Sequence, residues 1–136
     1  MTPPRKLPLG TETVVLLAAT PAGCHVLSFS LRQKGHEVLC CTTAAALPQL
    51  VRGAIPSCLV VMESCPQGDA MEVCRLIRSL GARIPVIVLH SAKPLDQRVA
   101  LLEAGADHVA DGPLSTPALC RLIELLTHRQ RRIALT

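Results

Sequence analysis

Five short segments with strand character recur along the chain, three of them largely continuous apolar runs, and a segment with helical periodicity follows each of them. Continuous apolar runs are typical of parallel strands buried on both faces, because a half-exposed strand would alternate with polar residues. Strands that alternate with helices form right-handed crossovers, which place helices on both faces of one sheet. The expected strands are 13–18, 36–41, 58–62, 84–89 and 107–110.

This alternation predicts a three-layer α/β/α fold of the flavodoxin-like kind, with a five-stranded parallel sheet in the order 2-1-3-4-5. Each helix should turn one apolar stripe toward the sheet, with its members three or four residues apart. The residues expected to face inward are Cys24, Leu27, Leu31, Leu47, Leu50, Val51, Ala70, Val73, Cys74, Ile77, Val99, Leu102, Leu119, Leu122, Ile123 and Leu126.

The length of 136 residues suits one domain that buries a core without disulfides or metals. Because the chain has no Trp or Tyr and a single Phe, this core must be aliphatic. No apolar run approaches the roughly 18 residues of a membrane span, and the charged, Pro-rich start lacks the apolar region of a signal peptide. We expect a soluble, cytoplasmic protein without a membrane partner. Its parts would be a flexible lead-in (1–12), the domain (13–128) and a basic tail or linker (129–136).

The seven cysteines do not suggest a disulfide framework, because their number is odd and no CxxC spacing occurs. Four of them lie at positions that should face the core, where Cys packs as a small hydrophobe; these are Cys24, Cys58, Cys74 and Cys120. Only the adjacent pair Cys40 and Cys41 and the loop residue Cys65 remain as redox or metal candidates. No cluster of His or Asp lies near them in sequence, so the indication is weak.

The segment 58–74 leads from an apolar strand through a short loop into an amphipathic helix. In parallel α/β sheets, ligands and chemistry are found at the carboxyl ends of the strands. This strand ends in Met62, Glu63 and Ser64, so any functional site of the usual kind would involve them.

Several motifs occur in order along the chain: PxxDxxEVCRxIR from Pro66, IPVIVL from Ile84 and RVxLLEAGAD from Arg98. With Pro113 and Ser115 after the fifth strand, they resemble the receiver domain of two-component response regulators, also called CheY-like, over nearly all of 13–126. The resemblance implies a module that accepts a phosphoryl group on an Asp after strand three. It also implies Mg²⁺ bound by an acidic pair after strand one, a Thr or Ser after strand four and a Lys before the proline.

Each of these positions holds a different residue type in this chain. The acidic pair falls on Ala18 and Ala19, and the phosphoacceptor falls on Met62. The Thr and Lys positions hold His90 and Gly112. Methyl groups do not bind Mg²⁺ and a thioether does not attack phosphorus. The resemblance therefore implies a pseudo-receiver that is not an enzyme and has no cofactor, with Mg²⁺ not expected.

Two residues near the expected phosphorylation site, Glu63 and His90, leave alternative functions open. A register slip of one residue would put the carboxylate of Glu63 at the phosphoacceptor position, although an exposed loop side chain is the simpler interpretation. His90 could sense pH or contact a ligand, or it could simply fill space above an apolar pocket. A phosphoacceptor with non-standard residues and a small-molecule or pH sensor in the vacated pocket thus remain as alternative functions.

We expect the chain to signal through protein contacts, as a homodimer or with a partner protein. In the family, the surface of helix four, strand five and helix five serves this purpose, and mixed charges there suit a symmetric pairing. The basic ending resembles a connector to a DNA-binding output domain, so nucleic acid would be contacted only through a domain missing from this chain. The expected interface residues are Lys93, Arg98, Glu103, Asp107, Arg121 and Glu124.

Overall fold

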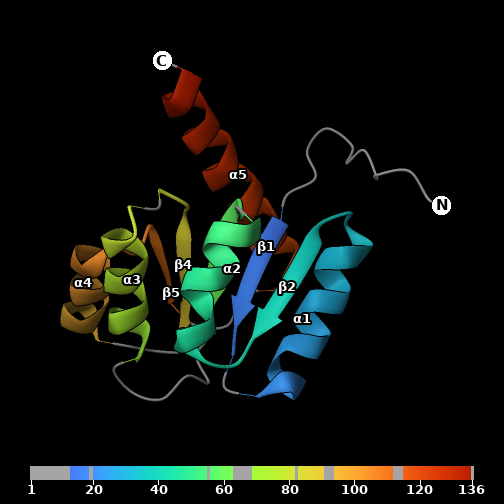
Figure 1. Cartoon of the computed structure of the whole chain (residues 1–136), viewed down its shortest axis with the longest axis horizontal. Helices are drawn as coiled ribbons and strands as arrows, with labels where there is room; N and C mark the ends of the chain where they lie inside the picture. Colours follow the sequence, from blue (N-terminus) through green and yellow to red (C-terminus); the bar gives the residue numbers. More distant parts are fainter. Residues whose placement is uncertain are drawn as a thin grey trace.

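The computed structural model describes residues 13–18, 20–54, 56–62, 69–81, 83–90, 94–111 and 115–135. These residues form a five-stranded sheet in the order β2-β1-β3-β4-β5, in which every neighbouring pair is parallel. The predicted architecture and strand order are therefore confirmed (Figure 1). The strands are β1 Thr13–Leu17, β2 Glu37–Cys41, β3 Cys58–Val61, β4 Val86–His90 and β5 His108–Asp111.

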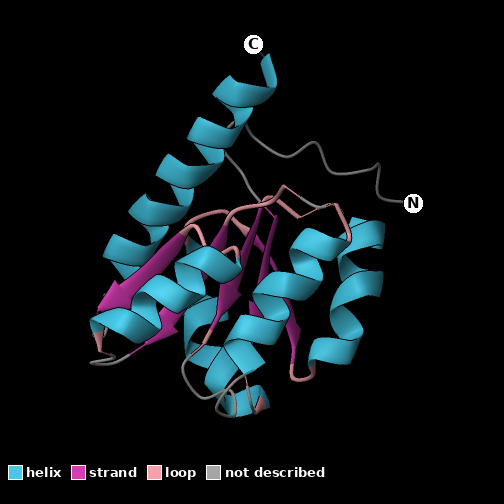
Figure 2. Cartoon of the chain, turned by 90° about the vertical axis from the view of Figure 1, so that its left-hand side faces the viewer, coloured by secondary structure: helices cyan, strands magenta, loops and turns pink. Residues whose placement is uncertain are grey.

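The helices cover both faces of the sheet, as Figures 1 and 2 show. Helices α1 and α5 pack on one face, whereas α2, α3 and α4 pack on the other. A 3-10 turn, η1 (Ala44–Ala46), leads directly into α2. The bounds are α1 Pro21–Gln33, α2 Leu47–Ala54, α3 Asp69–Ser79, α4 Leu95–Ala104 and α5 Thr116–Leu135.

The central strands are buried on both faces, which explains their continuous apolar sequences. Val14 and Leu16 pack beneath α1 and α5, while Val15 and Leu17 pack beneath α2 and α3. All four side chains are at most 2% exposed. Each face thus has an aliphatic core, as the near absence of aromatic residues requires.

The predicted inward faces of α1, α2, α3 and α5 are confirmed, but that of α4 is wrong. Val99 and Leu102 are 41% and 47% exposed, whereas Leu101 is 3% exposed. Helix α4 packs at the β5 edge of the sheet, where Leu101 and Ala104 join the core. At this edge the core covers only a narrow stripe of α4, so the large apolar side chains of Val99 and Leu102 stay at the surface.

The strand limits differ from the predicted ones by one or two residues. β4 begins at Val86 because Pro85, which precedes it, has no backbone N–H to donate to a neighbouring strand. β5 runs to Asp111, one residue further than predicted. Gly35, at φ 92°, follows the end of α1, as expected for a helix-terminating glycine.

Residues 129–135, predicted as a tail or linker, continue α5 as helix. The end of this helix extends beyond the sheet in both views (Figures 1 and 2). Residues 1–12, predicted as a lead-in, lie outside the described residues. None of the described helices combines the length and apolar character that a membrane crossing requires.

Candidate functional site

The carboxyl ends of β1 and β3 lie side by side at the edge of the sheet where a receiver-type site would form. Leu17 pairs in register with Val61, and the backbone N–H of Met62 donates to Leu17 O at 2.9 Å. On the other side of β1, the N–H of Ala18 donates to Cys41 O at 3.1 Å. These bonds fix Ala18 and Met62 as neighbours just past the two strand ends.

Both of these residues are apolar and integrated into the core. Ala18 is fully buried, and Met62 is half-buried against the cluster beneath α1 and α5. Their side chains offer a methyl group and a thioether, neither of which is a ligand for Mg²⁺, a cation that binds oxygen. The residues described at this site therefore do not fit the magnesium ion of phosphorylatable receivers.

Three of the six predicted pocket residues, Ala19, Glu63 and Gly112, lie outside the described residues. The same holds for Ser64, Cys65 and Ser91. His90 is placed by its backbone as the last residue of β4, so its predicted position at a strand end is confirmed.

The sheet brings a residue to this edge that the sequence analysis did not select. Asp111 ends β5 and pairs in register with His90. Because β4 and β5 are parallel and paired in this register, an Asp and a His lie next to each other at the carboxyl edge of the sheet. The sequence signal was present, since an Asp directly after an apolar strand marks such an edge, but β5 was predicted to end one residue earlier.

The cysteines predicted as core residues, Cys24, Cys58, Cys74 and Cys120, are all buried. Burial raises the pKa of the Cys74 thiol to about 11, and burial also raises the pKa of Cys120. Such thiols remain protonated and unreactive at neutral pH.

The remaining described cysteines do not form a metal site. Cys41 is buried with the α2 and α3 core, whereas its neighbour Cys40 is exposed and lines a groove beside α1. Among the residues the structure describes, no group of three or more His, Cys, Asp or Glu side chains could hold a metal ion.

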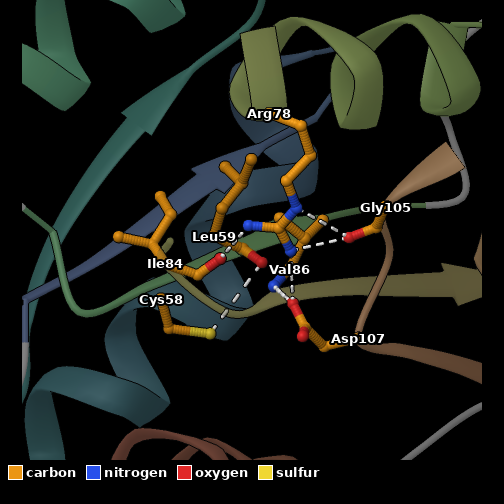
Figure 3. Close-up of polar contacts among 7 residues, drawn as sticks. All are labelled: Cys58, Leu59, Arg78, Ile84, Val86, Gly105 and Asp107. Carbon is orange, nitrogen blue, oxygen red and sulfur yellow. Dashed lines mark hydrogen bonds and ion pairs between the residues drawn. The ribbon is translucent and has the colours of Figure 1, made fainter. Parts of the chain in front are cut away.

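The six predicted interface residues have different surroundings. Glu103, Arg121 and Glu124 are exposed, Arg98 is half-buried, and Lys93 lies outside the described residues. Asp107 is 40% exposed but is engaged within the chain, because its carboxylate accepts hydrogen bonds from Arg78 and from the Val86 backbone (Figure 3). It lies at the amino-terminal edge of the sheet, away from the candidate site.

Comparison with curated proteins finds response regulators. The chain is 32% identical over 102 residues to response regulator MprA of Mycobacterium leprae, covering 75% of this chain and 45% of that protein. Against MprA of Mycolicibacterium vanbaalenii it is also 32% identical over 102 residues, covering 75% and 40%. The chain thus spans less than half the length of these relatives. No family model matches it.

Solved structures of receiver domains have the same fold. A signal receiver domain from Vibrio parahaemolyticus superposes with a TM-score of 0.81 at 16% identity, covering 92% of this chain and 96% of that one. A CheY-like receiver domain protein from Methanospirillum hungatei gives 0.79 at 18% identity, covering 90% and 98%. At these identities the likeness establishes the fold alone.

Proposed function

Since this chain carries a response-regulator receiver domain, we propose that it is a pseudo-receiver, which signals through protein contacts without being phosphorylated and without binding Mg²⁺. The observation that carries the proposal is that a buried Ala18 and a half-buried Met62 directly follow the adjoining ends of β1 and β3. The chemistry of a receiver needs carboxylates at these positions, one to attack phosphorus and others to hold the metal.

The packing of Ala18 and Met62 into the core supports the proposed loss of phosphorylation. Met62 contacts an apolar cluster that also includes Leu89 at the end of β4. Packing of this kind removes the polar surroundings that a phosphoaspartate, with its bound metal, would need. The site accordingly has no role as an enzyme in this proposal, and the retained scaffold serves recognition.

The face of α4 supports recognition by a second copy of the chain. Leu95, Val99 and Leu102 are 67%, 41% and 47% exposed and stand at the i, i+4, i+7 positions of one helical stripe. Helix α4 itself also carries the exposed carboxylate of Glu103 and the half-buried guanidinium of Arg98, whereas the exposed Arg121 and Glu124 lie on α5, which packs on the other face of the sheet. An apolar stripe with a rim of both charges suits an isologous dimer, in which each charge meets its opposite across the two-fold axis.

In a longer protein, such a dimer would position output domains. The relatives extend well beyond the segment that this chain matches. Helix α5 includes the basic segment 128–132, continues to Leu135 and extends past the sheet, so it offers a rigid connection to a following domain (Figure 2). Control of transcription through an attached DNA-binding domain is the output that we propose.

The loss of phosphorylation is tested by incubating the chain with a small phosphodonor and Mg²⁺ and measuring its intact mass. The expected result is an unchanged mass, with a phosphorylatable receiver as the positive control. An added phosphoryl group on any residue would overturn the proposal. The same measurement would also detect phosphorylation of Glu63 or of a nearby hydroxyl group.

The dimer is tested by sedimentation velocity over a concentration series. Leu102→Glu should shift the chain toward monomer by adding a charge to the apolar stripe. Val26→Glu, on the exposed face of α1, is the matched control because Val26 is 75% exposed and lies on the opposite edge of the sheet. Equal effects of both substitutions, or a monomer at all concentrations, would contradict this face.

A further inference from the structure

A groove of about 450 Å³ lies between α1 and the carboxyl end of β2, at the edge of the sheet opposite α4. Three cysteines are among the residues that line it: Cys24 from α1, and Cys40 and Cys41 from the end of β2. Figure 1 shows α1 directly beside β2. Thiols from a helix and from the edge strand therefore gather at one opening in the surface.

The side chains of Cys24 and Cys40 belong to the same face of the sheet. Cys24 packs in the cluster beneath α1 and α5, together with Val38. Cys40 lies two residues after Val38, and residues two apart on a strand share a face. Cys41 belongs to the other face, where it packs in the same cluster as Leu47 of α2. The pair that can meet across the groove is therefore Cys24 and Cys40.

The two thiols differ in exposure in the way that the two members of a redox pair do. Cys40 is exposed, whereas Cys24 is 2% exposed. Redox-sensing cysteines are accessible to solvent and stand next to a second cysteine, which reacts with the first oxidation product. Cys24 is the fourth residue of α1, which begins at Pro21, so fraying of this first turn would bring its thiol to the groove.

The charges of the groove select the oxidant. Apart from the thiols, His25 and Arg32 of α1 are the ionisable groups among the lining residues, which include no Asp or Glu. Arg32 Nη2 donates to Val38 O at 3.0 Å, so the guanidinium is held beside the edge strand. A small disulfide that carries carboxylates, such as glutathione disulfide, would therefore meet a guanidinium that no lining carboxylate offsets.

We propose that Cys24 and Cys40 form a reversible disulfide across this groove when an anionic small disulfide oxidises them. The Cys40 thiolate attacks one sulfur of glutathione disulfide, forms a mixed disulfide and releases one glutathione thiolate. The Cys24 thiolate then attacks the Cys40 sulfur, forms the bond within the chain and releases the second glutathione. Two protein thiols are oxidised, one small disulfide is reduced to two thiols, and the two protein protons pass to the departing thiolates.

This disulfide would act close to the strand-end site. It would tie the first turn of α1 to the end of β2, and that end is bonded to the site because Ala18 N donates to Cys41 O at 3.1 Å. Oxidation would thus give the receiver fold an input that requires no phosphoryl group. The inference goes beyond the proposed function and does not depend on it, since a phosphorylatable receiver could contain the same disulfide.

The test places the full chain in glutathione buffers with an increasing fraction of glutathione disulfide. Alkylation of the remaining thiols is followed by intact-mass measurement and by peptide mapping without reduction. We expect the monomer to lose the mass of two hydrogen atoms, with the linkage mapped to the peptides that contain Cys24 and Cys40. Treatment with dithiothreitol should restore both thiols.

Variants of the chain assign the order of the two steps. Cys24→Ala should stop at the mixed disulfide and retain one bound glutathione, whereas Cys40→Ala should form neither the mixed disulfide nor the linkage. Cys41→Ala is the matched control and should form the linkage as the parent chain does. Each variant is compared with and without Cys65→Ala, which removes the one cysteine outside the described residues. Circular dichroism checks that each variant is folded.

The role of Arg32 is tested through the rate of the first step. Arg32→Glu should slow the reaction with glutathione disulfide by about threefold or more and leave the reaction with the uncharged hydroxyethyl disulfide unchanged. Arg52→Glu, an equivalent reversal at an exposed position on α2, should leave both rates unchanged. Equal slowing with both oxidants would contradict electrostatic selection of an anionic disulfide.

Three results would overturn the disulfide itself. One is the absence of a linkage between Cys24 and Cys40 in the folded chain at the most oxidising buffer ratio. Another is a linkage of either cysteine to a different partner, in the same chain or in a second copy. The third is a Cys24→Ala variant that takes up no glutathione, because Cys40 would then not be the thiol that reacts first.

Discussion

Arg78 Nη2 lies 2.7 Å from Asp107 Oδ2, and this ion pair joins α3 to the start of β5 (Figure 3). The same guanidinium donates to Gly105 O at 2.6 Å and to Ile84 O at 2.9 Å. Asp107 and Val86 exchange two further bonds, from Asp107 N to Val86 O at 2.8 Å and from Val86 N to Asp107 Oδ2 at 2.7 Å. One pair of side chains therefore ties α3, β4 and the α4–β5 turn together.

We predict that Asp107→Ala lowers the free energy of unfolding by about 1–3 kcal/mol, because the N–H of the fully buried Val86 loses its acceptor. Asp107→Asn should cost less, under about 1 kcal/mol, because its amide oxygen still accepts that bond and only a part-exposed ion pair is lost. Urea unfolding measures both values.

Glu103→Ala is the control for these two substitutions, since Glu103 is exposed on α4 and should change stability by no more than about 0.5 kcal/mol. Equal costs at Asp107→Ala and Glu103→Ala would contradict a structural role for the carboxylate of Asp107.

Gly105 and Gly53 should respond in opposite directions to replacement by Ala. Gly105 has φ 124°, and a Cβ there would lie 2.7 Å from Arg78 Cγ. Gly53 is helical, and nothing lies within 4 Å of its added Cβ. We predict that Gly105→Ala destabilises the chain by more than about 1 kcal/mol, while Gly53→Ala stabilises it by about 0.5–1 kcal/mol.

Thermal unfolding monitored by circular dichroism distinguishes these outcomes. A Gly105→Ala variant as stable as the parent would mean that the α4–β5 turn adopts another conformation. The Gly53→Ala variant shows whether the assay resolves effects of this size.

The fold could be predicted from the sequence because its main signal is local. Runs such as 58–61 are apolar at every position, so side chains on both faces of the strand must be buried. Only a sheet with helices on both faces provides this burial. Helix α4 was the exception: Leu101 and Leu102 are adjacent, and periodicity alone did not decide which one the sheet edge covers. That choice depends on where α4 sits beside α3 and β5, which is tertiary information.

The site was predicted in part for the same reason. The strand ends locate Ala18, Met62 and His90, so the residue types at this edge of the sheet follow from the sequence. The pairing of His90 with Asp111 depends on strand register, and the engagement of Asp107 depends on an arginine 29 positions away. The sequence contains these residues without indicating that they meet.

Restoring oxygen ligands should restore sensitivity to magnesium. We predict that Ala18→Asp alone costs about 1–3 kcal/mol, because it places a carboxyl group at a fully buried position. In the double variant Ala18→Asp with Met62→Asp, millimolar Mg²⁺ should raise the unfolding temperature by offsetting the two adjacent carboxylates. The parent chain should not respond.

Thermal unfolding with and without MgCl₂ measures this difference, and NaCl at matched ionic strength is the control. An equal stabilisation of the parent chain by Mg²⁺ would show that it already has a metal site, and this would contradict the proposed loss of Mg²⁺ binding.

Alkaline pH should destabilise the chain through Cys74. Burial raises the pKa of this thiol to about 11 from a value of 9.0, so between these values the unfolded chain loses a proton that the folded chain keeps. The stabilising effect is complete below pH 9 and is lost as the pH rises toward 11. At about 1.4 kcal/mol per pKa unit, the loss is at most about 2–3 kcal/mol.

Cys74→Ala isolates this effect in urea unfolding measured from pH 8 to 11. The substitution leaves a cavity, which lowers stability equally at every pH, but it removes the titrating thiol. We therefore expect a shallower decline between pH 9 and 11 in the variant than in the parent chain. The absence of Tyr leaves no phenol to titrate in this range. Parallel declines in the two chains would mean that the Cys74 thiol ionises equally in the folded and unfolded states.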